Sequence, residues 1–377
     1  MSVICKQLIF REIRLNTMFG LIFFVWTSMS GCKKKEQDDR ITIRWKEKKA
    51  VSVSFPGQKL ESVSEDALPK LVKITRKSSE NQVAILGEFS KEGDLVVFEP
   101  LVPFTRGLDY QIYIQNQNSG TFGIPMADAS DAPELVQFFP SADTLPENLL
   151  KVFLHFTHPM REGQSGKFVT LIKNGSDTIH GAFLDLQPEL WNENRTILTL
   201  WLDPGRIKRD LQPNKKLGTP LQNHASYQII VSREWQDTNG GKLKTAFKKT
   251  FITTSRDSIS PAPARWKLAL PKKGTNQPIK VHFKESLDHS LLTETLSITT
   301  VNGQPLTGKW RIGPKEKSAQ FTPGGPWNHD NYILQVETRL EDLAGNNINR
   351  HFDRDVSKES RPLSSAEIIN IPFNTQK

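Results

Sequence analysis

The chain has 377 residues, with 50 Lys and Arg against 41 Asp and Glu and a formal net charge of +9. The charges are interspersed, apart from Lys33 to Lys35 and the stretch 206–216, whereas nucleic-acid binding needs a concentrated basic face. We therefore expect no nucleic-acid partner. A chain of this length exceeds what one hydrophobic core usually holds, so we expect two or three domains.

The first 31 residues have the layout of a secretory signal. Residues 1–17 carry three basic residues and one acidic residue, and the next segment, MFGLIFFVWTSM, has no charged residue. About a dozen apolar residues are too few to span a bilayer, which takes roughly 20, but they suit the apolar core of a signal peptide. Ser30 and Gly31 follow as small residues directly before Cys32. The segment predicts export of the chain.

Met29, Ser30, Gly31 and Cys32 resemble the lipobox of bacterial lipoproteins, in which a peptidase cuts before a cysteine that carries lipid. Met29 stands where the lipobox usually has leucine. The resemblance implies a signal peptide at 1–31 and lipidation of Cys32; the alternative is an ordinary signal peptide with an incidental cysteine. Each buried methylene contributes roughly 0.8 kcal/mol, and two or more acyl chains anchor stably. We expect the protein to meet a membrane through this N-terminal lipid.

The cysteine count agrees with an anchor. The chain has two cysteines, Cys5 and Cys32, so a product cut before Cys32 can form no internal disulfide. The charged residues 32–40 then form a tether, because such a segment cannot fold by itself. Lysine followed by acidic residues after the cysteine resembles the surface-export signal of Bacteroidetes-type lipoproteins; the alternative is a solvated linker. We predict a lipid-anchored protein of the cell envelope, at the outer membrane, with surface exposure left open.

Three copies of one pattern follow the tether. FEPLVPFTRGLDYQIYI (Phe98–Ile114) and FTPGGPWNHDNYILQV (Phe321–Val336) both run Phe-x-Pro-x-x-Pro-aromatic, polar turn, then a tyrosine and an alternating strand. A diverged copy between them contains LTLWLDPGRIK, an insertion at 206–226, and ASYQIIV. Period-2 alternation, with Asn-Gly pairs at 174–175 and 302–303 between strand-like segments, predicts an all-β fold of sandwich domains.

The second and third copies share a D-x-x-G turn. Asp237 and Gly240 lie in DTNGG, and Asp342 and Gly345 lie in DLAGN, each aspartate ten residues after the strand tyrosine. An aspartate that accepts hydrogen bonds from its own turn, with glycine at positive φ, explains both sequences. Calcium takes six to eight oxygens, and each turn offers one carboxylate. We predict structural turns and no cofactor, with calcium as the alternative.

The tyrosines and several tryptophans recur at matching places. Tyr110, Tyr227 and Tyr332 each open a strand, which predicts packing of the tyrosine-corner kind rather than ligand binding. Trp327 stands where the first copy has Phe104, a substitution typical of a core position.

The order of alternating strand, proline-rich strand end, tyrosine strand and D-x-x-G turn resembles bacterial Ig-like domains of the SbsA type. The likeness spans most of residues 131–357 and, more faintly, 40–125. It implies tandem Ig-like β-sandwiches that serve as spacers or as adhesive or binding modules in surface-layer and envelope proteins. We predict Ig-like domains at 41–128, 131–257 (with the 206–226 insertion) and 262–357, followed by a C-terminal tail at 358–377 that could add an edge strand.

Candidate chemistry is sparse. Trp191 and Trp201 have no counterpart in the other copies, and with the insertion they are the best candidates for a recognition surface, because binding concentrates in loops. His155 and His158 lie three apart on a predicted strand, so they face opposite sides and cannot share a metal. No catalytic motif appears, so we predict no catalytic residues and no enzyme.

Two functions follow from this interpretation. The first is a non-catalytic structural, adhesive or spacer protein of the envelope. The alternative is an accessory subunit that binds a cell-surface glycan or protein. An exposed tryptophan pair would favour the second function, and a buried pair the first.

Overall fold

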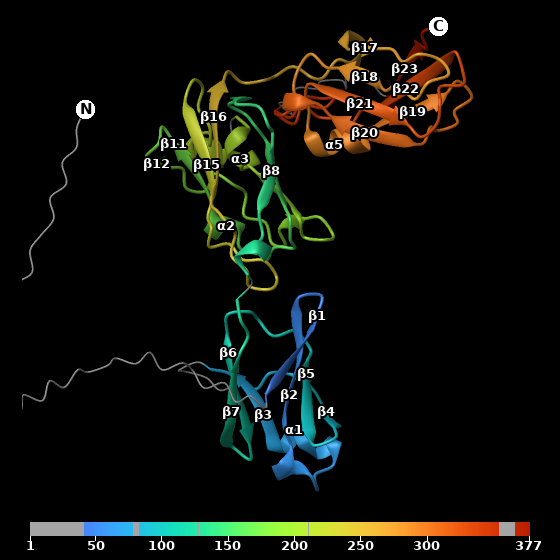
Figure 1. Ribbon diagram of the computed structural model, residues 1–377. Helices are drawn as coiled ribbons and strands as arrows, with labels where there is room; N and C mark the ends of the chain where they lie inside the picture. The colour runs from blue at the N-terminus through green and yellow to red at the C-terminus, as the bar shows by residue number, and fades with distance from the viewer. Residues whose placement is uncertain (1–40, 78–82, 127, 210, 354–365) are drawn as a thin grey trace, which may run out of the picture.

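The computed structural model describes residues 41–377 apart from 78–82, 127, 210 and 354–365. The predicted signal peptide, Cys32 and the tether therefore lie outside the described residues. The described chain forms three β-sandwiches in series, each around its own hydrophobic core (Figure 1). The first and second are arranged end to end, and the third turns to the side from the far end of the second. No helix in this part of the chain is long and apolar enough to cross a bilayer.

The first sandwich occupies the chain up to about residue 124. One sheet has the order β1-β2-β5-β4 and the other β3-β6-β7. Along β6 every second residue is buried, as the alternation predicts. The strands are β1 (Thr42–Lys46), β2 (Lys49–Pro56), β3 (Val72–Arg76), β4 (Gly87–Glu92), β5 (Leu95–Pro100), β6 (Asp109–Ile114) and β7 (Gln117–Gly123), with one helical turn, α1 (Leu68–Leu71).

The second sandwich has sheets of order β13-β14-β10-β8 and β12-β11-β15-β16-β9, in which β16 and β9 run parallel. Three short helices, α2 (Ser165–Phe168), α3 (Pro204–Ile207) and α4 (Gln212–Leu217), lie in its connections. The strands are β8 (Leu135–Phe139), β9 (Thr144–Pro146), β10 (Lys151–Phe156), β11 (Val169–Lys173), β12 (Asp177–Thr178), β13 (Leu190–Trp191), β14 (Ile197–Trp201), β15 (Ser226–Val231) and β16 (Phe247–Thr254).

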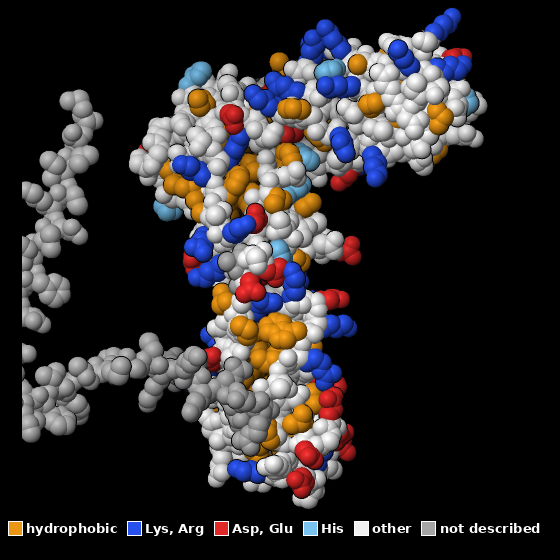
Figure 2. All heavy atoms as spheres, in the orientation of Figure 1, with side chains coloured by type: hydrophobic (Ala, Val, Ile, Leu, Met, Phe, Trp, Pro, Cys, Tyr) orange, Lys and Arg blue, Asp and Glu red, His pale blue; other side chains and the backbone are white. Residues whose placement is uncertain are grey.

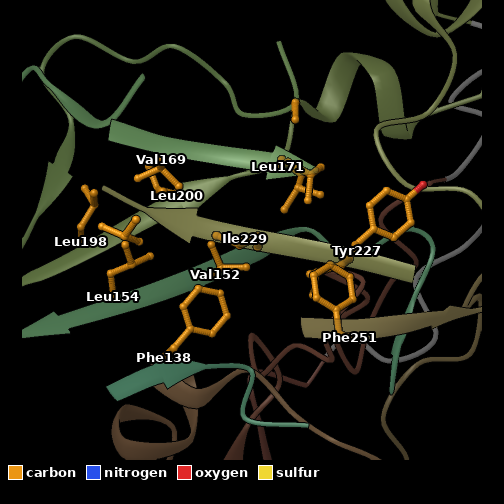
Figure 3. Close-up of a cluster of buried hydrophobic side chains, with 14 of the residues drawn as sticks. Phe138, Val152, Leu154, Val169, Leu171, Leu198, Leu200, Tyr227, Ile229 and Phe251 are labelled. Carbon is orange, nitrogen blue, oxygen red and sulfur yellow. The ribbon is translucent and has the colours of Figure 1, made fainter. Parts of the chain in front are cut away.

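Figure 3 shows how the two sheets of this sandwich share one interior. Side chains from β8, β10 and β14 meet those from β11, β15 and β16. Fully burying each leucine- or valine-sized side chain contributes roughly 1.5–3 kcal/mol, so this layer stabilises a domain that has no disulfide. The labelled members are Phe138, Val152, Leu154, Val169, Leu171, Leu198, Leu200, Tyr227, Ile229 and Phe251.

The third sandwich has sheets of order β17-β18-β21-β20 and β19-β22-β23. Short 3-10 turns (Gln58–Leu60, Glu65–Ala67, Ala129–Asp131, Pro263–Arg265 and Pro314–Glu316) lie in the connections of the chain. The elements are β17 (Lys267–Ala269), β18 (Ile279–His282), α5 (His289–Glu294), β19 (Leu296–Thr300), β20 (Gly308–Ile312), β21 (Ser318–Pro323), β22 (Asn331–Glu337) and β23 (Ile368–Asn374).

The C-terminal segment corrects the predicted domain boundary. Strand β23 pairs with β22 along all seven of its residues, and Phe373 is buried in the core of the third sandwich. The residues after 365 therefore complete this domain, instead of forming a separate tail from 358. The alternative that this segment adds an edge strand is the arrangement observed.

The three strand tyrosines are buried, as predicted, and each hydroxyl accepts a hydrogen bond from a backbone N–H just upstream. The donors are Thr105 for Tyr110 at 2.9 Å, Gln222 for Tyr227 at 2.8 Å, and the N–H three residues before Tyr332 at 3.0 Å. A buried ring with its hydroxyl tied to the preceding loop fixes the entry of the chain into the strand. Trp327 is fully buried too, which confirms its core position.

Candidate functional site

The turn at Asp237 is organised by the aspartate itself. Asp237 Oδ1 accepts hydrogen bonds from the backbone N–H groups of Asn239 (2.8 Å) and Gly241 (2.7 Å). Gly240 has φ +85°, a conformation that costs an L-residue free energy. The carboxylate is thus occupied by its own turn. The backbone of Asp237 forms a β-bridge with Met160, which ties the turn to the second sandwich.

The turn at Asp342 repeats this geometry in the third sandwich. Its Oδ1 accepts from the N–H groups of Ala344 (2.8 Å) and Asn346 (2.9 Å), and Oδ2 accepts from the Asn346 amide at 2.8 Å. Gly345 has φ +80°. The two sequence repeats therefore place equivalent aspartates and glycines in equivalent turns.

Asp342 also belongs to a carboxylate cluster that sequence reasoning missed. One oxygen each from Asp257, Glu285 and Asp342 lies within 4.8 Å of the others. Burial, together with the charge of Asp257, raises the pKa of Asp342 to about 8 and that of Glu285 to about 7. Such groups hold protons near neutral pH, because close carboxylates in a buried place cannot all ionise. The three residues are 28 and 57 positions apart in the chain, so no local pattern signals the cluster.

The cluster lies at the junction of the second and third sandwiches, which is held by direct contacts. The N–H of Leu150 donates to the carbonyl of Leu343 at 2.9 Å. Lys151 Nζ lies 3.1 Å from Asp288 Oδ2 and 2.6 Å from Glu341 Oε2. Burial alone would lower the pKa of Lys151, but the two carboxylates outweigh it and raise that pKa.

Two further sets of contacts cross or brace the same junction. Glu316 accepts a hydrogen bond from the N–H of Ser141 at 3.0 Å. The linker residue Asp257 exchanges two hydrogen bonds with Asn148, at 2.8 and 2.9 Å. These bonds join groups that are buried or half-buried, so they hold the second and third sandwiches in one arrangement.

The predicted pair Trp191 and Trp201 does not form one surface. Trp191 lies opposite Leu198 of β14 in the strand pairing, so it shares the buried face of the sheet with that residue. Trp201, the last residue of β14, lies on the same face as Thr199, which is the opposite face. Trp191 packs against Trp235 and donates its indole N–H to Glu189 at 2.8 Å. Both side chains are half-buried, and neither of the two predicted outcomes, an exposed pair or a buried pair, is realised.

The predicted insertion is anchored by Arg206. This buried guanidinium donates to the carbonyls of His180, Gly181, Leu217 and Gly218, at 2.8 to 3.3 Å. The side chain therefore fastens the insertion to the sandwich. The basic stretch of the sequence thus includes a buried structural arginine.

The histidines 155 and 158 lie in different surroundings. His155 lies at the junction with the third sandwich, where its ring is 5.2 Å from that of Phe139 and 5.7 Å from that of His289. Burial, with the neighbouring His155, lowers the pKa of His289 to about 4. His158 lies near Asp131 at the other end of the second sandwich, with Nε2 at 3.6 Å from the carboxylate.

The junction of the first and second sandwiches is held by a different set of contacts. Arg106 donates its backbone N–H to the carbonyl of Asn239 at 3.3 Å, and Lys48 forms an ion pair with Asp131. The Arg106 side chain donates to the carbonyl of Lys48 at 2.8 Å and lies over the ring of Trp45. A groove of 420 Å³ opens between the two domains beside these contacts. Its residues are far apart in the sequence, which explains why no motif predicts it.

One family model matches part of the chain. Residues 258–357 match the model of a family described as a bacterial Ig-like domain. No match is found among curated proteins.

Three solved structures are among those that the chain matches. The FN1–FN3 domains of chicken CNTN1 are 11% identical (89% of this chain, 98% of that chain, TM-score 0.19). The N-terminal part of the bacterial S-layer protein SbsC is 12% identical (66% and 45%, TM-score 0.22), and E. coli alpha-2-macroglobulin is 12% identical (54% and 13%, TM-score 0.22). The chain spans 13% of the length of the E. coli protein. Scores this low carry no argument. The family match and the three sandwiches make this an all-β chain of Ig-like domains.

Proposed function

We propose that this chain is a non-catalytic, lipid-anchored protein of the bacterial cell envelope, in which SbsA-type Ig-like domains act as a structural or adhesive module held away from the membrane. The observation that carries the proposal is the junction of the second and third sandwiches. Buried ion pairs and hydrogen bonds there keep two independent cores in one orientation, as a spacer requires.

The sequence supports the proposed localisation at the membrane. Cys32 follows an apolar segment and two small residues, and a charged tether separates it from the first strand at Thr42. Acyl chains on Cys32 would hold the chain at the outer membrane, with the first sandwich nearest to the bilayer.

Metabolic labelling with an alkyne fatty acid tests this proposal. We expect label in the wild type and none in Cys32→Ala. Protease shaving of intact cells then separates a surface position, in which the wild type is cut, from an inward position, in which it is not. A wild-type protein that takes up no label would overturn the anchor.

A second function, an accessory subunit that binds a glycan or a protein, is favoured by the groove between the first and second sandwiches. That groove, rather than the two tryptophans, offers an open volume lined by charged side chains from two domains.

A further inference from the structure

The groove at the first junction is built from both domains. The first sandwich contributes Lys49, at the start of β2, and Val102 and Pro103, after β5. The second contributes Arg161, after β10, and Arg195, just before β14. Its volume of 420 Å³ falls within the roughly 300–1,000 Å³ of ligand pockets.

Positive charge is in excess in this groove. Among the described residues that line it, three side chains are cationic and one, Glu162, is a carboxylate. Within the described part of the chain, the side chains of Lys49 and Arg195 form no ion pair or hydrogen bond. Arg161 is oriented by a hydrogen bond from Nη1 to Gln236 Oε1 at 2.6 Å. The groove therefore presents cations whose negative partners the described residues do not supply.

Neutral hydrogen-bonding groups lie among these cations. The Gln164 amide and the Thr238 hydroxyl line the groove, and neither side chain has a hydrogen-bond partner among the described residues. Both can donate and accept hydrogen bonds. Val102, 75% exposed, adds an apolar edge, and Figure 2 shows hydrophobic side chains gathered on the first sandwich just below the junction.

This combination of groups can recognise a sugar acid. A sugar acid carries a carboxylate for the cations, hydroxyls for amide and hydroxyl side chains, and apolar C–H faces for an aliphatic edge. A bilayer presents its phosphates on a plane, whereas these cations line a concavity between two domains. An extended chain can enter that concavity, so the geometry favours a polymer over a membrane surface.

We propose that the groove between the first and second sandwiches binds an acidic polysaccharide. The uronate carboxylates pair with Lys49, Arg161 and Arg195, and sugar hydroxyls bond to Gln164 and Thr238. The inference rests on the accessory-subunit form of the proposed function and names its ligand class. Binding in solution does not depend on acylation. Absence of the lipid label would therefore overturn the anchor alone, and absence of sugar binding would overturn the groove proposal alone.

The test is calorimetric titration of the purified full chain in detergent with oligogalacturonate, and with the same oligomer after methyl esterification. The charge-matched variants are Lys49→Gln with Arg195→Gln in the groove, and Lys309→Gln with Arg311→Gln on exposed positions of the third sandwich. We expect the groove variant to bind oligogalacturonate roughly tenfold more weakly, because it removes two of the three cations that pair with the uronate carboxylates. The third-sandwich variant should bind like the wild type, and the ester should bind far more weakly than the acid.

An independent variant, Val102→Glu, places a negative charge at the exposed edge of the groove and should weaken binding in the same direction. Equal losses in the groove and third-sandwich variants would overturn the proposal, because the attraction would then be unspecific. No binding of oligogalacturonate by the wild type, with or without binding to vesicles of anionic phospholipid, would overturn it as well.

Discussion

Lys151 in the second sandwich and Asp288 in the third form an ion pair across the domain junction, with 3.1 Å between Nζ and Oδ2. The Asp288 side chain is 4% exposed and that of Lys151 is 13% exposed. Glu341 completes the group, so one ammonium pairs with two carboxylates. Breaking a buried pair leaves an uncompensated charge, which makes the arrangement of the two domains depend on this lysine.

Replacing Lys151 with alanine should therefore destabilise the second and third sandwiches by about 3 kcal/mol, measured by urea denaturation. The matched control is Lys242→Ala, which removes an exposed ion pair with Glu234 and should cost far less, because solvent screens that pair. Small-angle scattering of folded Lys151→Ala should also show a wider spread of domain arrangements. Similar, small costs for both variants would show that the junction does not rely on this lysine.

The carboxylate cluster predicts a pH dependence. The folded-state pKa values of Asp342 and Glu285 are raised, to about 8 and about 7, above their unfolded values. The folded state then binds more protons, so their contribution to stability is full below the unfolded pKa and is lost as pH rises through the folded pKa. We expect the midpoint of thermal unfolding of the third sandwich to fall between about pH 6.5 and pH 8.5.

Two variants check the origin of this slope. In Asp342→Asn and Glu285→Gln the fall over the same pH interval should be smaller. His289, whose pKa is lowered to about 4, acts in the opposite sense but below that interval. A midpoint that rises with pH in the wild type would contradict the raised pKa values.

The turn glycines differ in what surrounds them. Gly345→Ala should destabilise the protein through its φ of +80° and through overlap of the new methyl group with Leu150 of the second sandwich. Gly175→Ala is the control, because Gly175 has φ +84° but open space around it. Strain alone costs of order 1–3 kcal/mol, so Gly345→Ala should exceed Gly175→Ala in a denaturation experiment. Equal costs would mean that Leu150 moves away freely.

Calcium should leave the melting temperature unchanged. The Asp237 and Asp342 carboxylates already accept two and three hydrogen bonds from their own turns, and further oxygens are needed for a calcium site. The measurement is thermal unfolding with added calcium and with a chelator. A calcium-dependent rise that disappears in Asp342→Asn would contradict this expectation and make the cluster at Asp257 the place to search.

Local patterns predicted much of the fold. Alternation along β6, β15 and β22 identified strands, and the recurring tyrosines identified buried strand heads, because both features depend on neighbours in the chain. The same local reasoning predicted the two aspartate turns. It was less successful for β23, since a short strand at the end of a chain is recognised by the partner it pairs with, here β22.

By itself, the sequence determined the features that arise within a few residues: the lipobox-like run before Cys32, the repeated strand and turn patterns, and the all-β class. Only the tertiary structure decided what lies between domains. The ion pairs of Lys151, the three carboxylates around Asp342 and the groove of Lys49 and Arg195 each join residues from distant parts of the chain. Side chains shift each other's pKa values, or bind one ligand together, only when packing brings them within a few ångströms. Their spacing along the chain does not predict that distance.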